Sequence, residues 1–155
     1  MRKSLIIAAI TLAACSSNDY NDIGDMQPAP APDAVATPPA RVEFMSDIAP
    51  VGSSNVRGKA RARTVGGATR IMLNIEGAPP NTQHPWRIHK GACGEAGALV
   101  GNVNEYPVLS ADAAGKASAR AQIAAPLSEQ EGYHVNVLNS ATDLNTVIAC
   151  GKLAR

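Results

Sequence analysis

A short stretch near the middle of the chain, residues 84 to 94, combines side chains that bind metals with one that cannot. It reads HPWRIHKGACG, and His84 and His89 are its candidate imidazole ligands. Imidazole is a common ligand for copper and zinc. Residues 85 to 90 are typical of a β-strand, in which side chains two positions apart share a face. The residue that shares a face with His89 is Arg87, a permanent cation, so this pair does not form a metal site.

The remaining histidine does not complete a metal cluster. His84 and His89 differ in parity and therefore face opposite sides of a regular strand. His134 lies in the segment YHVNVL and shares a face with Asn136 and Leu138 if that strand is regular. It is roughly 13 Å from Leu138 along such a strand. We therefore interpret His89 as a polar strand residue, with weak metal buffering by the three histidines as an alternative.

The N-terminal residues have the pattern of an export signal. Two basic residues precede an apolar run, residues 5 to 14, which is far shorter than the ~20 residues that span a bilayer. The motif LAAC that ends at Cys15 resembles the bacterial lipobox, and this implies removal of residues 1–14 and lipid attachment to Cys15. A plain signal peptide is the alternative. Ser16 after the cysteine implies, by the habit of such lipoproteins, an outer-membrane protein that faces the periplasm and contacts the membrane through its anchor.

Two cysteines remain if Cys15 carries lipid, namely Cys93 and Cys150. An even pair of cysteines in an exported protein predicts a disulfide. Such a bond would matter here, because a chain with one Trp and one Phe must build its core largely from small aliphatic side chains.

The rest of the chain divides into a tether and one domain. Residues 15–42 contain the lipidated cysteine and a segment rich in Pro and Asp without apolar periodicity, which predicts a semi-extended tether. Residues 43–155 have the size of one small domain. Their alternating segments predict strands at residues 55–64, 69–77, 85–90, 106–111, 116–123, 133–138 and 146–153, and residues 126–132 a loop or helical turn.

Glycine pairs and turns connect these segments. Gly66-Gly67 predicts a hairpin between residues 55–64 and 69–77, and the turn at Ala114-Gly115 predicts a second hairpin between 106–111 and 116–123. About eight short strands without a long helical pattern predict an all-β fold, a sandwich or flattened barrel.

One predicted strand presents four basic residues on a single face: Arg57, Lys59, Arg61 and Arg63. This stripe could bind an anionic polymer of the cell envelope or a phosphate group. The alternative is a solvated outer face in which basic side chains protect an edge strand. We expect no nucleic-acid partner.

The order of these pieces resembles the copper/zinc superoxide dismutase superfamily, in particular its short exported bacterial members. The similar pieces are Val56-Arg57-Gly58, the segment IEGAPPNTQHPWRIH, the Gly-Ala-Cys-Gly turn, the strand YHVNVL and the closing IACGKL. They extend over residues 43–155. The resemblance implies an eight-stranded Greek-key β-barrel and an intrachain disulfide between Cys93 and Cys150.

The family's metal ligands are mostly missing here. The family holds copper with four histidines, two of them in a His-x-His pair that reads Arg87-Ile88-His89 in this chain. A third ligand position holds Leu138, and the loop 94–109, where the bridging and zinc ligands would lie, has no histidine. His84 matches a non-ligand position near the metal. The loop 139–146 lacks the basic residue that would steer superoxide.

We therefore expect an envelope-anchored, non-catalytic binding or structural module without a cofactor, not an enzyme. The alternative is a residual or rebuilt copper site with superoxide dismutase activity or copper binding. If the resemblance holds, Arg87 places a fixed charge where the metal was. We expect Asp143 or Glu95 to neutralise this charge, with a carboxylate or phosphate ligand as the alternative.

Overall fold

The computed structural model describes residues 41–155. The predicted signal peptide, the lipidation site at Cys15 and the tether up to residue 40 lie outside the described residues. The described part is all-β and contains, besides strands, one short 3-10 helix, η1 (Val103–Glu105). Nine strands are formed: β1 (Arg41–Pro50), β2 (Arg57–Val65), β3 (Ala68–Glu76), β4 (Gln83–His84), β5 (Trp86–Lys90), β6 (Leu109–Ser110), β7 (Ala117–Ile123), β8 (Tyr133–Ser140) and β9 (Asp143–Leu153). The predicted all-β class is confirmed.

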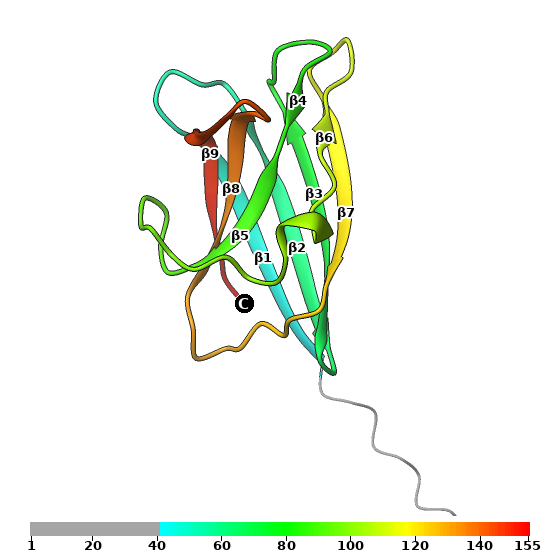
Figure 1. Cartoon of the computed structure of the whole chain (residues 1–155), viewed down its shortest axis with the longest axis vertical. Coiled ribbons are helices and arrows are strands. Elements are labelled where there is room, and N and C mark those ends of the chain that lie inside the picture. Colours follow the sequence, from blue (N-terminus) through cyan, green and yellow to red (C-terminus); the bar gives the residue numbers. More distant parts are fainter. Residues whose placement is uncertain (1–40) are drawn as a thin grey trace, which may run out of the picture. The chain divides into compact units, whose positions relative to one another are not determined.

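Seven of the strands form one antiparallel sheet in the order β5-β8-β9-β1-β2-β3-β7. Figure 1 shows that this sheet curls into a half-barrel, so that its edge strands β5 and β7 approach each other. The short sheet of β4 and β6 lies between them, where β4 contacts β8 and β6 contacts β7. The curled sheet encloses the core.

Strict alternation explains why β2, β3 and β7 are strands. In each of them every second side chain is buried and the others are exposed, as expected for a sheet with one solvated face. Gly66 begins the two-residue turn between β2 and β3 with φ +62°, a conformation that favours glycine. The hairpin predicted from Gly66-Gly67 is confirmed.

The core combines a few aromatic side chains with the small buried residues of β2 and β7. Trp86 is 1% exposed, and its ring meets that of Tyr106 edge to face with centroids 5.0 Å apart. Phe44 meets Tyr133 in the same way at 6.2 Å. Such pairs contribute about 0.5–1.5 kcal/mol beyond their burial.

Two features of the sheet differ from the sequence prediction. Strand β1 was not predicted, and it begins at Arg41, two residues before the expected start of the domain. The second predicted hairpin is wrong. Its turn forms, with the Asp112 N–H donating to the Lys116 carbonyl at 2.9 Å, but β6 pairs with β4 and β7 pairs with β3.

Residues 41–155 form no helix with the length and apolar character needed to cross a bilayer.

Candidate functional site

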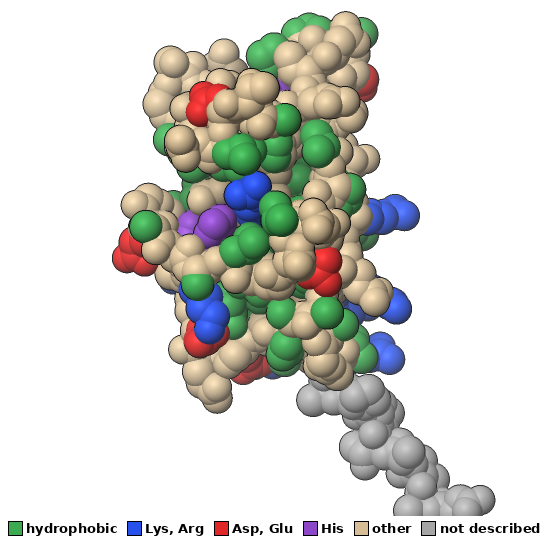
Figure 2. Space-filling model, in the orientation of Figure 1, with side chains coloured by type: hydrophobic (Ala, Val, Ile, Leu, Met, Phe, Trp, Pro, Cys, Tyr) green, Lys and Arg blue, Asp and Glu red, His purple; other side chains and the backbone are tan. Residues whose placement is uncertain are grey.

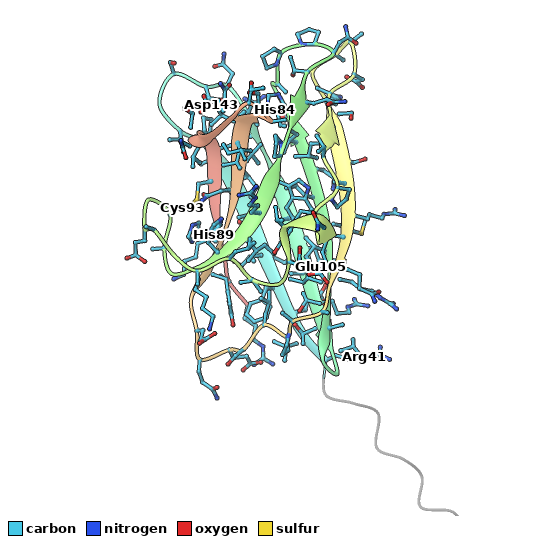
Figure 3. The ribbon with its side chains drawn as sticks, in the orientation of Figure 1. Arg41, His84, His89, Cys93, Glu105 and Asp143 are labelled. Atoms are coloured by element: carbon cyan, nitrogen blue, oxygen red, sulfur yellow. A yellow bond between two sulfur atoms is a disulfide. The ribbon has the colours of Figure 1, made fainter. Side chains whose placement is uncertain are left out.

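Four polar side chains lie on the face of strands β5 and β8 that points away from the core. Trp86 and Ile88 of β5 are buried in the core, so the alternate residues Arg87 and His89 point outward and are half-buried. The antiparallel register places Asn136 directly opposite Arg87 and His134 opposite His89. We call these four residues the β5–β8 cluster: Arg87, His89, His134 and Asn136. Figure 3 labels His89 beside the loop that carries Cys93.

The two imidazole rings of this cluster are stacked on each other. Their centroids are 5.7 Å apart and their planes are inclined by 21°. The Nδ1 of His89 donates to the Gly97 carbonyl at 2.8 Å, and the Nδ1 of His134 donates to the Gly91 carbonyl at 3.1 Å. A carbonyl oxygen only accepts, so both Nδ1 atoms carry hydrogen. The lone pair of a neutral ring then lies on Nε2.

Only one of these lone pairs is available to a ligand. The His134 side chain is fully buried, and its Nε2 accepts a hydrogen bond from the Asn136 Nδ2 at 3.2 Å. The Nε2 of His89 has no partner among residues 41–155. One free imidazole nitrogen is far from the set of ligands that copper chemistry needs. No group of three His, Cys, Asp or Glu side chains with metal-binding geometry occurs in the described part of the chain.

The loop after β5 positions both imidazoles. The disulfide between Cys93 and Cys150 ties this loop to β9, and this confirms the predicted bond. Gly97 lies so close to the strand that an added Cβ would be within 1.6 Å of the Lys90 carbonyl oxygen. Because only glycine fits there, the Gly97 carbonyl can reach His89. Sequence reasoning missed this role of Gly97.

Arg87 has no ion-pair partner among residues 41–155, contrary to the expectation for Asp143 and Glu95. The Glu95 carboxylate accepts the Ala92 N–H at 2.7 Å within its own loop. The Asp143 carboxylate accepts from the Asn139 side chain at 2.9 Å, and this bond lowers its pKa. Both acids are therefore occupied by local partners, and the proposed neutralisation of Arg87 by either of them is wrong.

The surroundings of Arg87 are partly apolar and contain one unpaired acceptor. Burial raises the pKa of Tyr106 to about 12, and the positive charge of Arg87 acts weakly against this rise. The Oδ1 of Asn136 is buried and has no hydrogen-bond partner among the described residues. A buried acceptor without a partner costs free energy, which a ligand or a water molecule recovers when it donates to it. Figure 2 shows one basic group beside the exposed imidazole on this face, with apolar side chains around it.

The other two candidate positions belong to the interior. His84 is 2% exposed; its Nδ1 bonds the Leu138 carbonyl at 3.2 Å, and its Nε2 bonds the Thr82 hydroxyl at 2.7 Å. The expectation that His84 and His89 face opposite sides agrees with this arrangement. Leu138 is buried, and the pairing of β8 with β9 shifts between Val137 and Leu138.

The direct contact of His89 with His134 was also missed by sequence reasoning. The signal that could have found it is the alternation of buried residues in both strands. Pairing the buried Ile88 with the buried Val135 fixes the register and places the two histidines opposite each other.

The basic stripe of β2 is exposed along its whole length, as predicted, on the sheet face that points away from the core. Its four side chains are Arg57, Lys59, Arg61 and Arg63. Strand β2 pairs with β1 on one side and β3 on the other, so the alternative explanation as protection of an edge strand is wrong.

A scan of protein-family models and a search of curated proteins gave no match to this chain. The assignment of a function therefore depends on the geometry of the residues themselves.

Proposed function

We propose that the chain is a lipoprotein of the bacterial cell envelope whose β domain is a non-catalytic module that binds an anion at the β5–β8 cluster. The observation that carries this proposal is the state of Arg87. Arg87 is half-buried and forms no ion pair among residues 41–155. Asn136, whose Oδ1 is unpaired among the described residues, lies opposite Arg87 in the register, and His89 lies two positions along the same face of β5.

A cation in such a place favours an anionic ligand. A guanidinium offers a planar set of N–H donors that matches a carboxylate or a phosphate. The unpaired Asn136 Oδ1 suits a hydroxyl or a protonated group on the same ligand. Binding needs no metal, because each ligand position that the resemblance assigns to copper, apart from His89, is held by another residue.

The scaffold we propose is a Greek-key barrel of the superoxide dismutase type. The order of the sequence motifs supports it, as do the curled antiparallel sheet and the bond from Cys93 to Cys150. The lipid anchor at Cys15 and the position in the outer membrane, facing the periplasm, rest on the lipobox-like motif and Ser16.

A copper site is the second candidate, and the stacked pair of His89 and His134 is the observation that favours it. The two rings are stacked, but the Nε2 of His134 already accepts a hydrogen bond from the Asn136 Nδ2. Copper held there would depend on His89 almost alone. We expect such binding to be weak, readily reversed by a chelator and without dismutase turnover.

Titration of the protein with inorganic phosphate and with citrate, followed by NMR of the arginine side-chain N–H groups, tests anion binding at Arg87. We expect saturable shifts of one arginine signal that disappear in Arg87→Gln. The matched control is Arg57→Gln, which removes an exposed arginine of β2 that already pairs with Glu76 at 2.7 Å and should leave those shifts unchanged. An unchanged set of saturable shifts in Arg87→Gln, or no shifts at all, would contradict the proposal.

A further inference from the structure

The outer face formed by β1, β2, β3 and β7 has an uneven distribution of charge. At the end where Arg41 begins β1, opposite Val65, five arginines and one glutamate give a formal net charge of +4. The five are called the tether-end arginines: Arg41, Arg61, Arg63, Arg70 and Arg120. At the other end of the face, Arg57 pairs with Glu76 at 2.7 Å, and Lys59 pairs with Asp47. Charges there cancel.

The tether-end arginines are poorly compensated within the described part of the chain. Glu43 serves two of them, at 3.0 Å from Arg61 and 3.6 Å from Arg63. Arg63 lies directly opposite Arg70 in the sheet, and like charges in that position destabilise a pair of strands. Among residues 41–155 no carboxylate forms an ion pair with Arg41, Arg70 or Arg120. An external anion would remove this repulsion.

Exposed apolar side chains are interleaved with these arginines. Met45 and Met72 flank Arg61 in the register of the sheet and are 52% and 42% exposed. A surface hollow is lined by both methionines, Arg61 and Lys152, among others. Basic side chains project past β7 at the right edge of Figure 2. Basic side chains beside exposed large apolar ones are typical of surfaces that bind anionic lipid bilayers.

We propose that the tether-end arginines dock on the phosphate headgroups of an anionic lipid bilayer. The place where the chain enters the domain favours this partner. The arginines lie at the end of the sheet where Arg41 begins β1, and the segment before it leads to the anchor at Cys15. A Pro-rich segment reaches about 3.1 Å per residue, so residues 16 to 40 can bring this end of the sheet to the membrane.

This inference rests on the proposed function in one respect, because the anchor places the domain near a membrane. Tethering raises the effective concentration of headgroups at the domain, so weak individual contacts suffice. The lipid anchor and the docking surface can fail separately. An unmodified Cys15 in the mature protein would contradict the anchor, whereas vesicle binding tests the docking surface.

Another occupant of the same surface is the chain's own tether, which carries Asp19, Asp22, Asp25 and Asp33. Its charge also complements the arginines. Lipid phosphates are favoured because the exposed methionines match a bilayer surface and not an acidic segment.

The test uses residues 16–155, which include the core formed among residues 41–155, in cosedimentation with vesicles of phosphatidylcholine alone or with phosphatidylglycerol added. We compare Arg63→Glu/Arg70→Glu with the control Arg57→Glu/Lys59→Glu, which changes the net charge by the same amount. Lys59, the nearer residue of the control pair, lies four positions from Arg63 along β2, roughly 13 Å, more than the Debye length of about 8 Å at physiological salt. We expect vesicle binding only with phosphatidylglycerol, at least about tenfold weaker for the tether-end variant and within about twofold of normal for the control.

Two further variants keep the outcome decisive. Arg63→Gln/Arg70→Gln removes charge without adding repulsion, and we expect a smaller loss in the same direction. Equal losses for the tether-end pair and the control pair would mean unspecific attraction and would overturn the proposal. Absence of binding to phosphatidylglycerol vesicles would do the same. Binding that emerges only when the four tether aspartates are replaced by asparagine would assign the surface to the chain's own tether, against the proposal.

Discussion

Loss of the disulfide between Cys93 and Cys150 should be among the most damaging changes to the β domain. The bond links positions 57 residues apart, and closing a loop of that length removes about 4 kcal/mol of conformational entropy, expressed as free energy, from the unfolded chain. In the folded state the bond also ties down the loop whose Gly91 and Gly97 carbonyls hold the two stacked imidazoles.

The perturbation is Cys93→Ala/Cys150→Ala, measured by urea unfolding with the fluorescence of Trp86, the chain's only tryptophan, which is 1% exposed. We expect the free energy of unfolding to fall by about 4 kcal/mol. The matched control is Glu95→Ala, which removes one hydrogen bond to the Ala92 N–H in the same loop and should cost roughly 1 kcal/mol or less. A loss below about 1 kcal/mol for the double variant, at an unchanged denaturant slope, would refute this reasoning.

Three further changes have defined outcomes. Burial raises the pKa of Tyr106 to about 12, so the contribution of Tyr106 to stability is present below pH 10 and is lost as the pH rises toward 12. The variant Tyr106→Phe should lower the free energy of unfolding by roughly 1 kcal/mol at neutral pH, and it should remove the alkaline loss when unfolding is measured as a function of pH. Hydrogen bonds from the backbone N–H groups of Asn102 and Ala124 lower the pKa of Glu105, so the contribution of Glu105 to stability is lost as the pH falls through that lowered value. The variant Glu105→Gln should flatten the acid side of the profile of stability against pH. An unchanged profile would count against these two hydrogen bonds. An added Cβ at Gly151 would collide with the backbone of β1. The variant Gly151→Ala should therefore lower the free energy of unfolding, measured by urea unfolding, by about 1–3 kcal/mol. An unchanged free energy of unfolding would contradict this close packing.

Local features of the fold were predictable, whereas pairing between distant segments was less so. The β2–β3 hairpin follows from alternation and a two-residue glycine turn, both of which are local. The turn between β6 and β7 fixes only the connection, and the partner of β6 is set by packing against β4. Strand β1 escaped prediction because it follows a Pro-rich segment and buries Ser46 among its apolar residues.

The candidate site was predicted in its parts and not in its contacts. The outward direction of Arg87 and His89 follows from strand parity. Their neighbours depend on the register of β5 with β8, which the sequence encodes only through the matching of buried residues. The carboxylates expected to pair with Arg87 form no ion pair with it among residues 41–155, because they accept hydrogen bonds within their own short loops, as Glu95 does. The irregular pairing with β9 beside Leu138 was not predictable from the alternation of β8.

The most direct test of a metal-independent binding module is the metal content of the purified protein after loading. The protein is incubated with Cu(II) and Zn(II) and dialysed, and the retained metal and the superoxide dismutase rate are then measured together. We predict well under one equivalent of retained copper, no retained zinc, and a dismutase rate no higher than that of free copper at the same concentration. One equivalent of tightly held copper with fast turnover would contradict the account.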